Sequence, residues 1–232
     1  MNNNVLQVKI KQRLNKLASN DYNNVECWQI AEAFNKAQVE WVRRQVHGNN
    51  LRKEGDESSK SLIDDLQVLL IEQPISGNNQ ELYFETNLIP GNYMYFKSLS
   101  IKSQTECCPD RSVSCYLAEV ANVSSLLDDP FRRPSAEWGE TFCTMQGNRF
   151  RIYHDNKFTV ASPKLTYYRF PQSISFAGCV SPATGAPTTN VESEFKDDIV
   201  EIIIDETVAI LAGDIELFNQ YQRTKTNAQT NT

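Results

Sequence analysis

The chain has only two histidines among its 232 residues, His47 and His154. Neither lies in a nucleophile-elbow or metalloprotease motif. The chain also contains no Walker A loop, no dinucleotide-binding glycine fingerprint and no EF-hand loop. A catalytic triad built on histidine would need one of the two to be positioned by tertiary structure alone. The sequence therefore predicts a protein that is not an enzyme and that holds no cofactor or metal.

Long apolar runs are missing as well. None approaches the roughly 20 residues that a membrane-spanning helix requires, and the first residues, MNNNVLQVKIKQR, lack the apolar stretch of a secretion signal. We therefore expect synthesis in the cytoplasm and no membrane contact. Basic residues are also too few to balance the acidic ones, since 23 Lys and Arg against 29 Asp and Glu give a net charge of −6. This balance argues against a protein that grips DNA by neutralising phosphates, although DNA could still pass beside it.

Six cysteines are present, at Cys27, Cys107, Cys108, Cys115, Cys143 and Cys179. In a protein made in a reducing cytoplasm we expect all six to be free thiols. The alternative is a metal site formed by the three cysteines between 107 and 115 together with Cys143. Adjacent cysteines followed by Pro109 lack the two-residue gap of a zinc knuckle, so the pattern favours free thiols.

The two ends of the chain have helical periodicity. Residues 192–223 carry apolar side chains at three- and four-residue steps, at Phe195, Ile199, Ile202, Ile203, Ile210, Leu211 and Leu217. Ser193 is the expected N-cap, and acidic residues follow in the first turn. Two further helices are predicted near the N-terminus, over residues 5–18 and from an Asn24 cap to His47, with Gly48 closing the second. Because the broad apolar face of the last helix needs a cover, we expect the terminal helices to form one bundle.

The middle of the chain has the shorter period of β-strands. Residues 48–61 are polar and predict a surface loop, with contact to a partner as an alternative. Residues 62–71 predict a short helix that turns into a strand. Further strands are predicted over 82–84, 93–103, 112–120, 141–145, 149–154, 157–160 and 165–170, with a helical turn at 123–129. Gly147-Asn148 and Asp155-Asn156 are candidate hairpin turns, and residues 178–190 form a loop or linker.

These patterns predict an α+β fold, in which a bundle of N-terminal and C-terminal helices carries a long antiparallel insertion resembling a sandwich or barrel. We expect the chain to divide into four segments. Residues 1–72 hold the N-terminal helices and a mobile loop, residues 73–190 the β-rich insertion, residues 191–223 the C-terminal helix, and residues 224–232 a flexible tail.

The most unusual local sequence is Asp129–Trp138, DPFRRPSAEW. Its two prolines predict an extended chain that presents Phe131, Arg132, Arg133 and Trp138. Arginine and tryptophan are frequent anchors of protein interfaces, which makes these four residues candidate interface residues, whereas the alternative is a solvated loop. Arg43 and Arg44 of the second helix, Arg223 at the end of the last helix and Lys225 of the tail complete the candidate interface set.

Several segments resemble one known family. The second helix carries IAEAFNKAQVEWVRRQV, with Asn35, Ala37, Gln38, Arg43 and Arg44, and the last helix carries FKDDIVEIIIDETVAILAGDIE. The β-rich part carries LLDDPFRRPS, GNRFRIYHDNKFTV and LTYYRFPQSI. Together they resemble the head-to-tail connector proteins, also called adaptor or ring proteins, of tailed bacteriophages. The ring proteins of crAss-like podoviruses are the most similar, and the resemblance covers nearly the whole chain.

The resemblance implies a virion structural protein without catalytic activity, made in the bacterial host and located at the head–tail junction. Copies, commonly twelve, would form a homo-oligomeric ring below the portal protein, extend the DNA channel and offer a platform to a downstream tail component or second ring protein. Packaged DNA would pass through without sequence-specific binding, and an acidic lumen would not retain it. Two alternatives stay open: another tail or capsid-associated β-protein that does not contact the portal, and a hydrolase that uses His154.

Overall fold

The computed structural model describes residues 1–15, 25–48, 60–105, 111–155, 158–180, 182, 184–214 and 224–227. The chain divides into two compact units, a helical unit (Met1–Val68 with Pro171–Thr232) and a β unit (Leu69–Phe170). The predicted α+β class is confirmed at this level. Residues 171–190, which the sequence pattern groups with the β-rich insertion, belong to the helical unit.

The helical unit contains α1 (Asn3–Asn15), α2 (Cys27–His47), α3 (Lys60–Leu66) and α5 (Asp197–Asp214), and residues 224–227 add a helical turn. Helix α1 buries Leu6, Ile10 and Leu14 along one face, as their spacing predicts. Helix α2 begins after Glu26, which forms a reciprocal capping box with Gln29, whereas the predicted cap, Asn24, lies outside the described residues. Its predicted end is confirmed: Gly48 adopts the left-handed conformation, with φ 67°, and donates its N–H to the Arg44 carbonyl.

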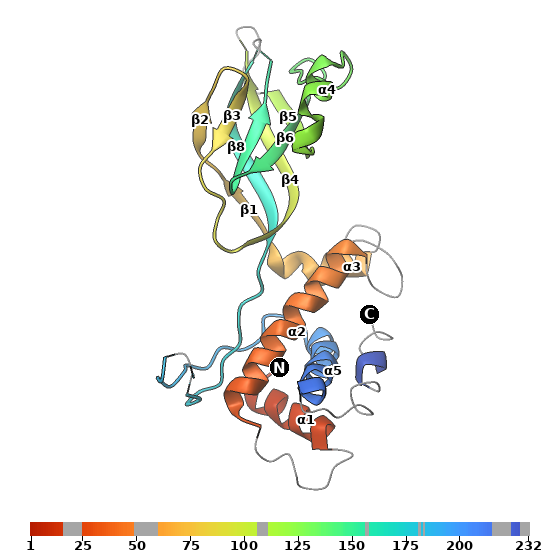
Figure 1. The fold of residues 1–232 in the computed structure, drawn as a ribbon, viewed down its shortest axis with the longest axis vertical. Helices are drawn as coiled ribbons and strands as arrows, with labels where there is room; N and C mark the ends of the chain where they lie inside the picture. Colours follow the sequence, from red (N-terminus) through yellow and green to blue (C-terminus); the bar gives the residue numbers. More distant parts are fainter. Residues whose placement is uncertain are drawn as a thin grey trace. The chain divides into compact units, whose positions relative to one another are not determined.

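Helix α5 contacts both α1 and α2, and Figure 1 shows it beside them, in blue. It begins at Asp197, later than predicted, because residues 192–196 are not helical. The predicted face is only partly correct. Ile199, Ile203 and Leu211 are buried, but Ile202 and Ile210 are half-buried. The remaining buried positions are Val200, Ile204, Thr207, Val208, Ala209 and Ala212. A helix with partners on two sides buries two adjoining stripes, which a single-face pattern does not describe.

Charged residues border these contacts between helices. Arg13 of α1 bonds Asp205 at 2.7 Å and also pairs with Glu201. Arg44 of α2 bonds Glu206 at 2.9 Å. Burial raises the pKa of Asp205, and the nearby Arg13 opposes the rise. These ion pairs thus connect α1 and α2 to α5 at the border of the apolar contacts.

Amide side chains of α2 hold the segment that follows the β unit. Asn35 donates to the Ile174 carbonyl at 3.2 Å and accepts from the Ile174 N–H at 2.8 Å, so it pairs with this backbone as a neighbouring strand would. Gln38 donates to the Gln172 carbonyl at 3.0 Å and to the Asn35 side chain at 3.1 Å. Asn35 and Gln38 therefore satisfy backbone groups that a strand-like segment on a helix surface would otherwise leave unpaired.

A disulfide joins Cys27, at the start of α2, to Cys179, and their Cα atoms are 5.9 Å apart. The prediction of six free thiols was therefore wrong. The two cysteines are 152 positions apart, and no local spacing signals such a pair. Bridges between residues 175 and 191 and between 180 and 187 fold this segment back on itself and bring Cys179 to the helix. Cys115 and Cys143 are free and buried, and Cys107 and Cys108 lie outside the described residues.

The β unit is one curled sheet of eight strands (Figure 1). They are β1 (Leu70–Pro74), β2 (Gly77–Asn79), β3 (Tyr83–Thr86), β4 (Tyr93–Gln104), β5 (Arg111–Leu117), β6 (Glu140–Gln146), β7 (Arg149–Tyr153) and β8 (Thr159–Arg169). Their spatial order is β1-β8-β4-β5-β6-β7-β3-β2. The two edge strands, β1 and β2, are separated by only two residues in the chain, so the edges of the sheet come together there.

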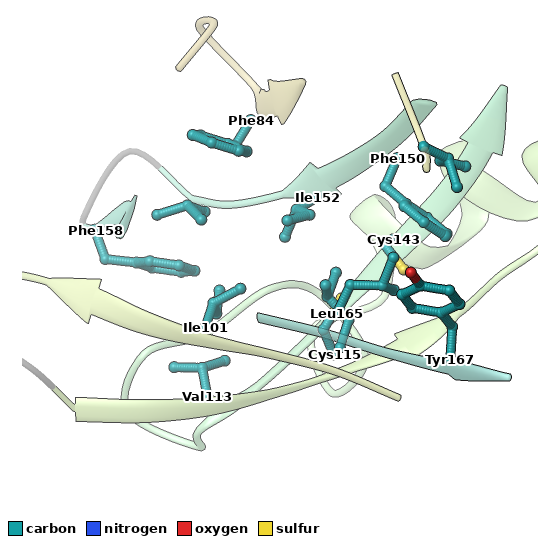
Figure 2. Close-up of a cluster of buried hydrophobic side chains, with 13 residues drawn as sticks. Phe84, Ile101, Val113, Cys115, Cys143, Phe150, Ile152, Phe158, Leu165 and Tyr167 are labelled. Atoms are coloured by element: carbon teal, nitrogen blue, oxygen red, sulfur yellow. The ribbon is translucent and has the colours of Figure 1, made fainter. Parts of the chain in front are cut away.

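The core lies inside this curl. Figure 2 shows Phe84 and Ile152 of β3 and β7 on one side of the core and Ile101 and Val113 of β4 and β5 on the other, with Phe150 of β7 near Tyr167 of β8. Strand β8 is continuous, although the sequence predicts two strands there. Ser162, with φ 45°, and Pro163 form a bulge opposite β4 without ending the strand.

Strand pairing differs from prediction in one respect that positions the candidate site. Strands β5 and β6 pair in parallel, whereas the sequence predicted an antiparallel sheet. A parallel pair requires a long crossover connection, and residues 118–139 provide it. The Gly147–Asn148 turn between β6 and β7 is confirmed, with both residues at φ 59°. The Asp155–Asn156 hairpin was wrong, because β7 pairs with β6 and β3, and β8 pairs with β4 and β1.

Candidate interaction surface

The crossover between β5 and β6 contains η2 (Val120–Asn122), α4 (Val123–Asp128) and the Asp129–Trp138 run. Leu126 of α4 packs on Phe142 and Tyr153, which lie on the outer face of the sheet. Phe142 and Tyr153 stack with their ring centroids 4.8 Å apart. Strand β6 is therefore buried on both faces along residues 141–144, so the crossover packs closely against the sheet.

Asp129 organises the first part of the run. Its carboxylate accepts the Phe131 N–H at 2.9 Å, and its carbonyl accepts the N–H groups of Arg132 and Arg133 at 3.2 and 3.0 Å. The prediction of an extended chain was therefore wrong, because the aspartate before Pro130 folds the chain into a capped turn. The turn leaves the Phe131 side chain 89% exposed.

Ser135 organises the second part of the run. Its hydroxyl accepts the Trp138 N–H at 3.3 Å, its carbonyl accepts the Gly139 N–H at 3.1 Å, and its backbone forms a bridge to Glu140. Gly139, with φ 72°, turns the chain into β6. Trp138 is left 76% exposed at this turn, so two ordered turns present two large aromatic side chains to solvent.

Phe131 and Trp138 line one hollow of about 780 Å³, which we call the crossover hollow. Its walls come from β5, the start of β6, α4 and the two turns. The lining residues are Tyr116, Leu117, Ala118, Glu119, Asn122, Ser125, Leu126, Pro130, Phe131, Arg132, Arg133, Trp138 and Glu140. Tyr116 and Leu117 of β5 are also exposed apolar residues, so the hollow carries much of the exposed apolar surface of the β unit.

Four charged side chains line the crossover hollow, the guanidinium groups of Arg132 and Arg133 and the carboxylates of Glu119 and Glu140. Arg132 lies 3.9 Å from the Asp129 carboxylate and is 71% exposed. Arg133 is exposed and has no carboxylate partner within the part of the chain that the structure describes. Burial raises the pKa of Tyr116, while Arg132 lowers it and Glu140 raises it. Tyr116 therefore remains a neutral phenol at physiological pH and can act as a hydrogen-bond donor.

The structure thus brings four of the candidate interface residues together, namely Phe131, Arg132, Arg133 and Trp138. Arg43 is exposed and pairs with Glu40 on α2, and Lys225 is exposed in the 224–227 turn. Arg44 is half-buried in its ion pair with Glu206, so its charge is used inside the helical unit. Arg223 lies outside the described residues.

Sequence reasoning missed Tyr116, Leu117 and Glu140, which complete the crossover hollow. A signal for Tyr116 was present in the alternation of β5, where Val113 and Cys115 are buried and the intervening residues are exposed. The signal for Glu140 depends on the parallel pairing of β5 with β6, which local sequence does not encode.

Other chemistry-bearing residues lie apart from this surface. His154 is buried, with Nδ1 3.2 Å from the Asp155 carbonyl, and its ring meets Phe158 edge-on. Cys115 and Cys143 belong to the core of the curled sheet, and burial raises the pKa of Cys115 well above its usual value. Over the described ranges, no group of three His, Cys, Asp or Glu residues is arranged to hold a metal ion.

No protein-family model matches the chain, and comparison with the curated proteins also finds no match. Among the helices that the structure describes, none combines the length and apolarity needed to cross a lipid bilayer. A functional proposal therefore rests on the resemblance seen in the sequence and on the arrangement of the residues.

Proposed function

We propose that the chain is a virion structural protein, an adaptor of the head-to-tail connector of a tailed bacteriophage. Copies of it, commonly twelve, form a ring that joins the portal protein to a downstream tail component and extends the DNA channel. The proposal rests on the sequence resemblance described above and on one structural observation. The N-terminal helices α1 and α2 contact α5, which follows the β unit in the sequence, so the β unit is an insertion in the sequence of the helical unit.

The role of Asn35 and Gln38 supports the proposal. Both residues belong to the helix segment that carries the resemblance, and both bind the backbone of the segment leading from the β unit to α5. Asn35 and Gln38 thus have a structural role, because they bind the backbone of the segment that leads from the β unit back to the helices. We infer that α1, α2 and α5 act as one bundle and that the curled sheet acts as a closed, barrel-like body.

The charge balance and the crossover hollow are compatible with an assembly role. A net charge of −6 allows DNA to pass without being retained, because like charges repel. Exposed Phe131 and Trp138 beside two arginines have the composition of an interface centre. Each unit has its own apolar core, so we expect a protomer to fold before it assembles.

Copy number in purified particles tests the proposal. Quantitative mass spectrometry against the portal protein is expected to find this chain at a fixed ratio near one to one. Its absence from purified particles would defeat the proposal.

Sedimentation of the isolated chain, with and without portal, tests how the ring forms. We expect a monomer or small oligomer alone and a closed ring on the portal, because portal sites hold neighbouring copies at high effective concentration. A stable ring without portal would show that assembly needs no template.

A further inference from the structure

We propose that the crossover hollow binds an extended segment of a partner protein that carries a bulky apolar side chain next to a carboxylate. The apolar side chain would lie against Phe131 and Trp138, and the carboxylate would pair with Arg133. This inference rests on the proposed assembly function, because it names the chemistry by which that function recruits a partner.

Hydrogen bonds fix the backbone of the two turns that carry the aromatic side chains. Phe131 and Trp138 are 89% and 76% exposed, yet each lies on a turn fixed by hydrogen bonds to Asp129 or Ser135. A hydrophobic residue on an ordered turn loses little conformational freedom on binding, which favours affinity. Large aromatic side chains exposed beside one hollow are typical of an interaction site.

The exposed guanidinium groups account for the second feature of the ligand, its carboxylate. Because Glu119 and Glu140 also line the hollow and leave it without net positive charge, the carboxylate is assigned to Arg133 and not to the hollow as a whole. Arg133 has no carboxylate partner within the described part of the chain, and Arg132 is only loosely paired, at 3.9 Å from Asp129. Guanidinium groups bind carboxylates through two parallel hydrogen bonds, which gives both strength and direction. A partner segment with an aspartate or glutamate beside its apolar residue would supply the missing partner.

The neighbouring backbone excludes one mode of recognition. Strand β5 pairs with β4 and β6, and β6 pairs with β5 and β7, so neither can accept an added strand at the crossover hollow. An added strand is therefore not the mode of recognition at β5 and β6, and we assign recognition to the exposed side chains of the hollow. A hollow of about 780 Å³ lies within the usual range of ligand pockets, which fits a few side chains of an extended segment and not a folded domain.

Selection from a library of displayed random seven-residue peptides tests the inference on the full chain. The expected enriched peptides have Asp or Glu within two positions of an aromatic or large aliphatic residue. A synthetic peptide with that pattern should bind in isothermal titration. Enriched peptides without an acidic residue, or no enrichment at all, would overturn the inference.

Variants locate the binding. Trp138→Ala is expected to weaken the synthetic peptide at least about tenfold, as for an interface anchor, and Arg133→Glu by roughly 10- to 100-fold. Repeating the selection on Arg133→Glu should enrich Lys or Arg in place of the acid. Leu88→Ala and Arg111→Glu, which change exposed residues of the same unit outside the crossover hollow, should bind within about twofold of the original chain.

The experiments distinguish a failure of this inference from a failure of the proposed function. Arg133→Glu changes an exposed side chain, so it keeps the test valid even if Trp138→Ala fails to fold. Unchanged peptide binding by Arg133→Glu would overturn the inference while leaving a ring in the particle unaffected. The expected peptide pattern, together with absence of the chain from purified particles, would support the inference and defeat the adaptor proposal.

Discussion

Replacing Asn35 by alanine should destabilise the helical unit through two backbone groups. The Asn35 side chain pairs with both the N–H and the carbonyl of Ile174, a residue that is only 2% exposed. Alanine leaves both groups buried without a partner, and each such loss costs about 1–3 kcal/mol. The better helix propensity of alanine returns about 0.5 kcal/mol. We therefore expect the free energy of unfolding to fall by roughly 1.5–5.5 kcal/mol.

Urea unfolding followed by tryptophan fluorescence measures this change. Trp138 lies in the β unit, so a Trp138→Phe background leaves Trp28 and Trp41 of α2 as reporters of the helical unit. Lys36→Ala, an exposed change on the same helix, is the matched control and should alter stability by less than about 0.5 kcal/mol. Equal stability of the Asn35→Ala and Lys36→Ala proteins would refute the reasoning.

Asn35→Asp tests the direction in which stability changes with pH. A carboxylate keeps the acceptor for the Ile174 N–H but places negative charge against the Ile174 carbonyl, whereas a protonated carboxyl group can still donate to it. The fold should therefore raise the pKa of the new aspartate. Its contribution to stability is then present at low pH and is lost as pH rises through that raised pKa. Relative to the original chain, the variant should lose less stability near pH 4 than near pH 7.

Three further predictions follow. Ile203→Asp should cost at least about 5 kcal/mol, because it removes a fully buried side chain and adds an unpaired charge, whereas Ile63→Asp, at a half-exposed position, should change the urea midpoint little. Dithiothreitol should lower the free energy of unfolding of the original chain by about 2–5 kcal/mol, because the bond between Cys27 and Cys179 closes a long loop. It should not change the stability of the Cys27→Ser protein, and equal sensitivity of both proteins would contradict the disulfide. Burial, with a smaller contribution from Cys143, raises the pKa of Tyr93 to about 12. The neutral phenol is favoured in the fold, so stability should fall as pH rises from about 10 to 12, and less steeply in Tyr93→Phe when urea midpoints are compared.

Local sequence patterns predict the helix faces, turns and strands that short-range interactions determine. Leu6, Ile10 and Leu14 mark the buried face of α1 because a helix repeats every 3.6 residues. Gly48 and the Gly147–Asn148 turn mark chain reversals because their positive φ angles favour glycine and asparagine. The helical turn at α4 and most strands follow in the same way.

Long-range pairing accounts for what the sequence could not predict. The Cys27–Cys179 bond joins residues 152 positions apart, and the parallel pairing of β5 with β6 depends on the whole crossover. Of the crossover hollow, Phe131 and Trp138 are recognisable by their unusual local sequence. Glu140 joins them only through the parallel register, in which Ser114 lies opposite Glu140.

A reconstruction of the intact phage particle tests the central claim most directly. The adaptor proposal predicts a closed ring of this chain, commonly of twelve copies, directly below the portal, in which the helical unit and the curled sheet fit the density of each subunit. It also predicts that the ring surrounds the DNA channel. Density below the portal that fits a different protein, with this chain absent from the particle or located elsewhere in it, would contradict the account.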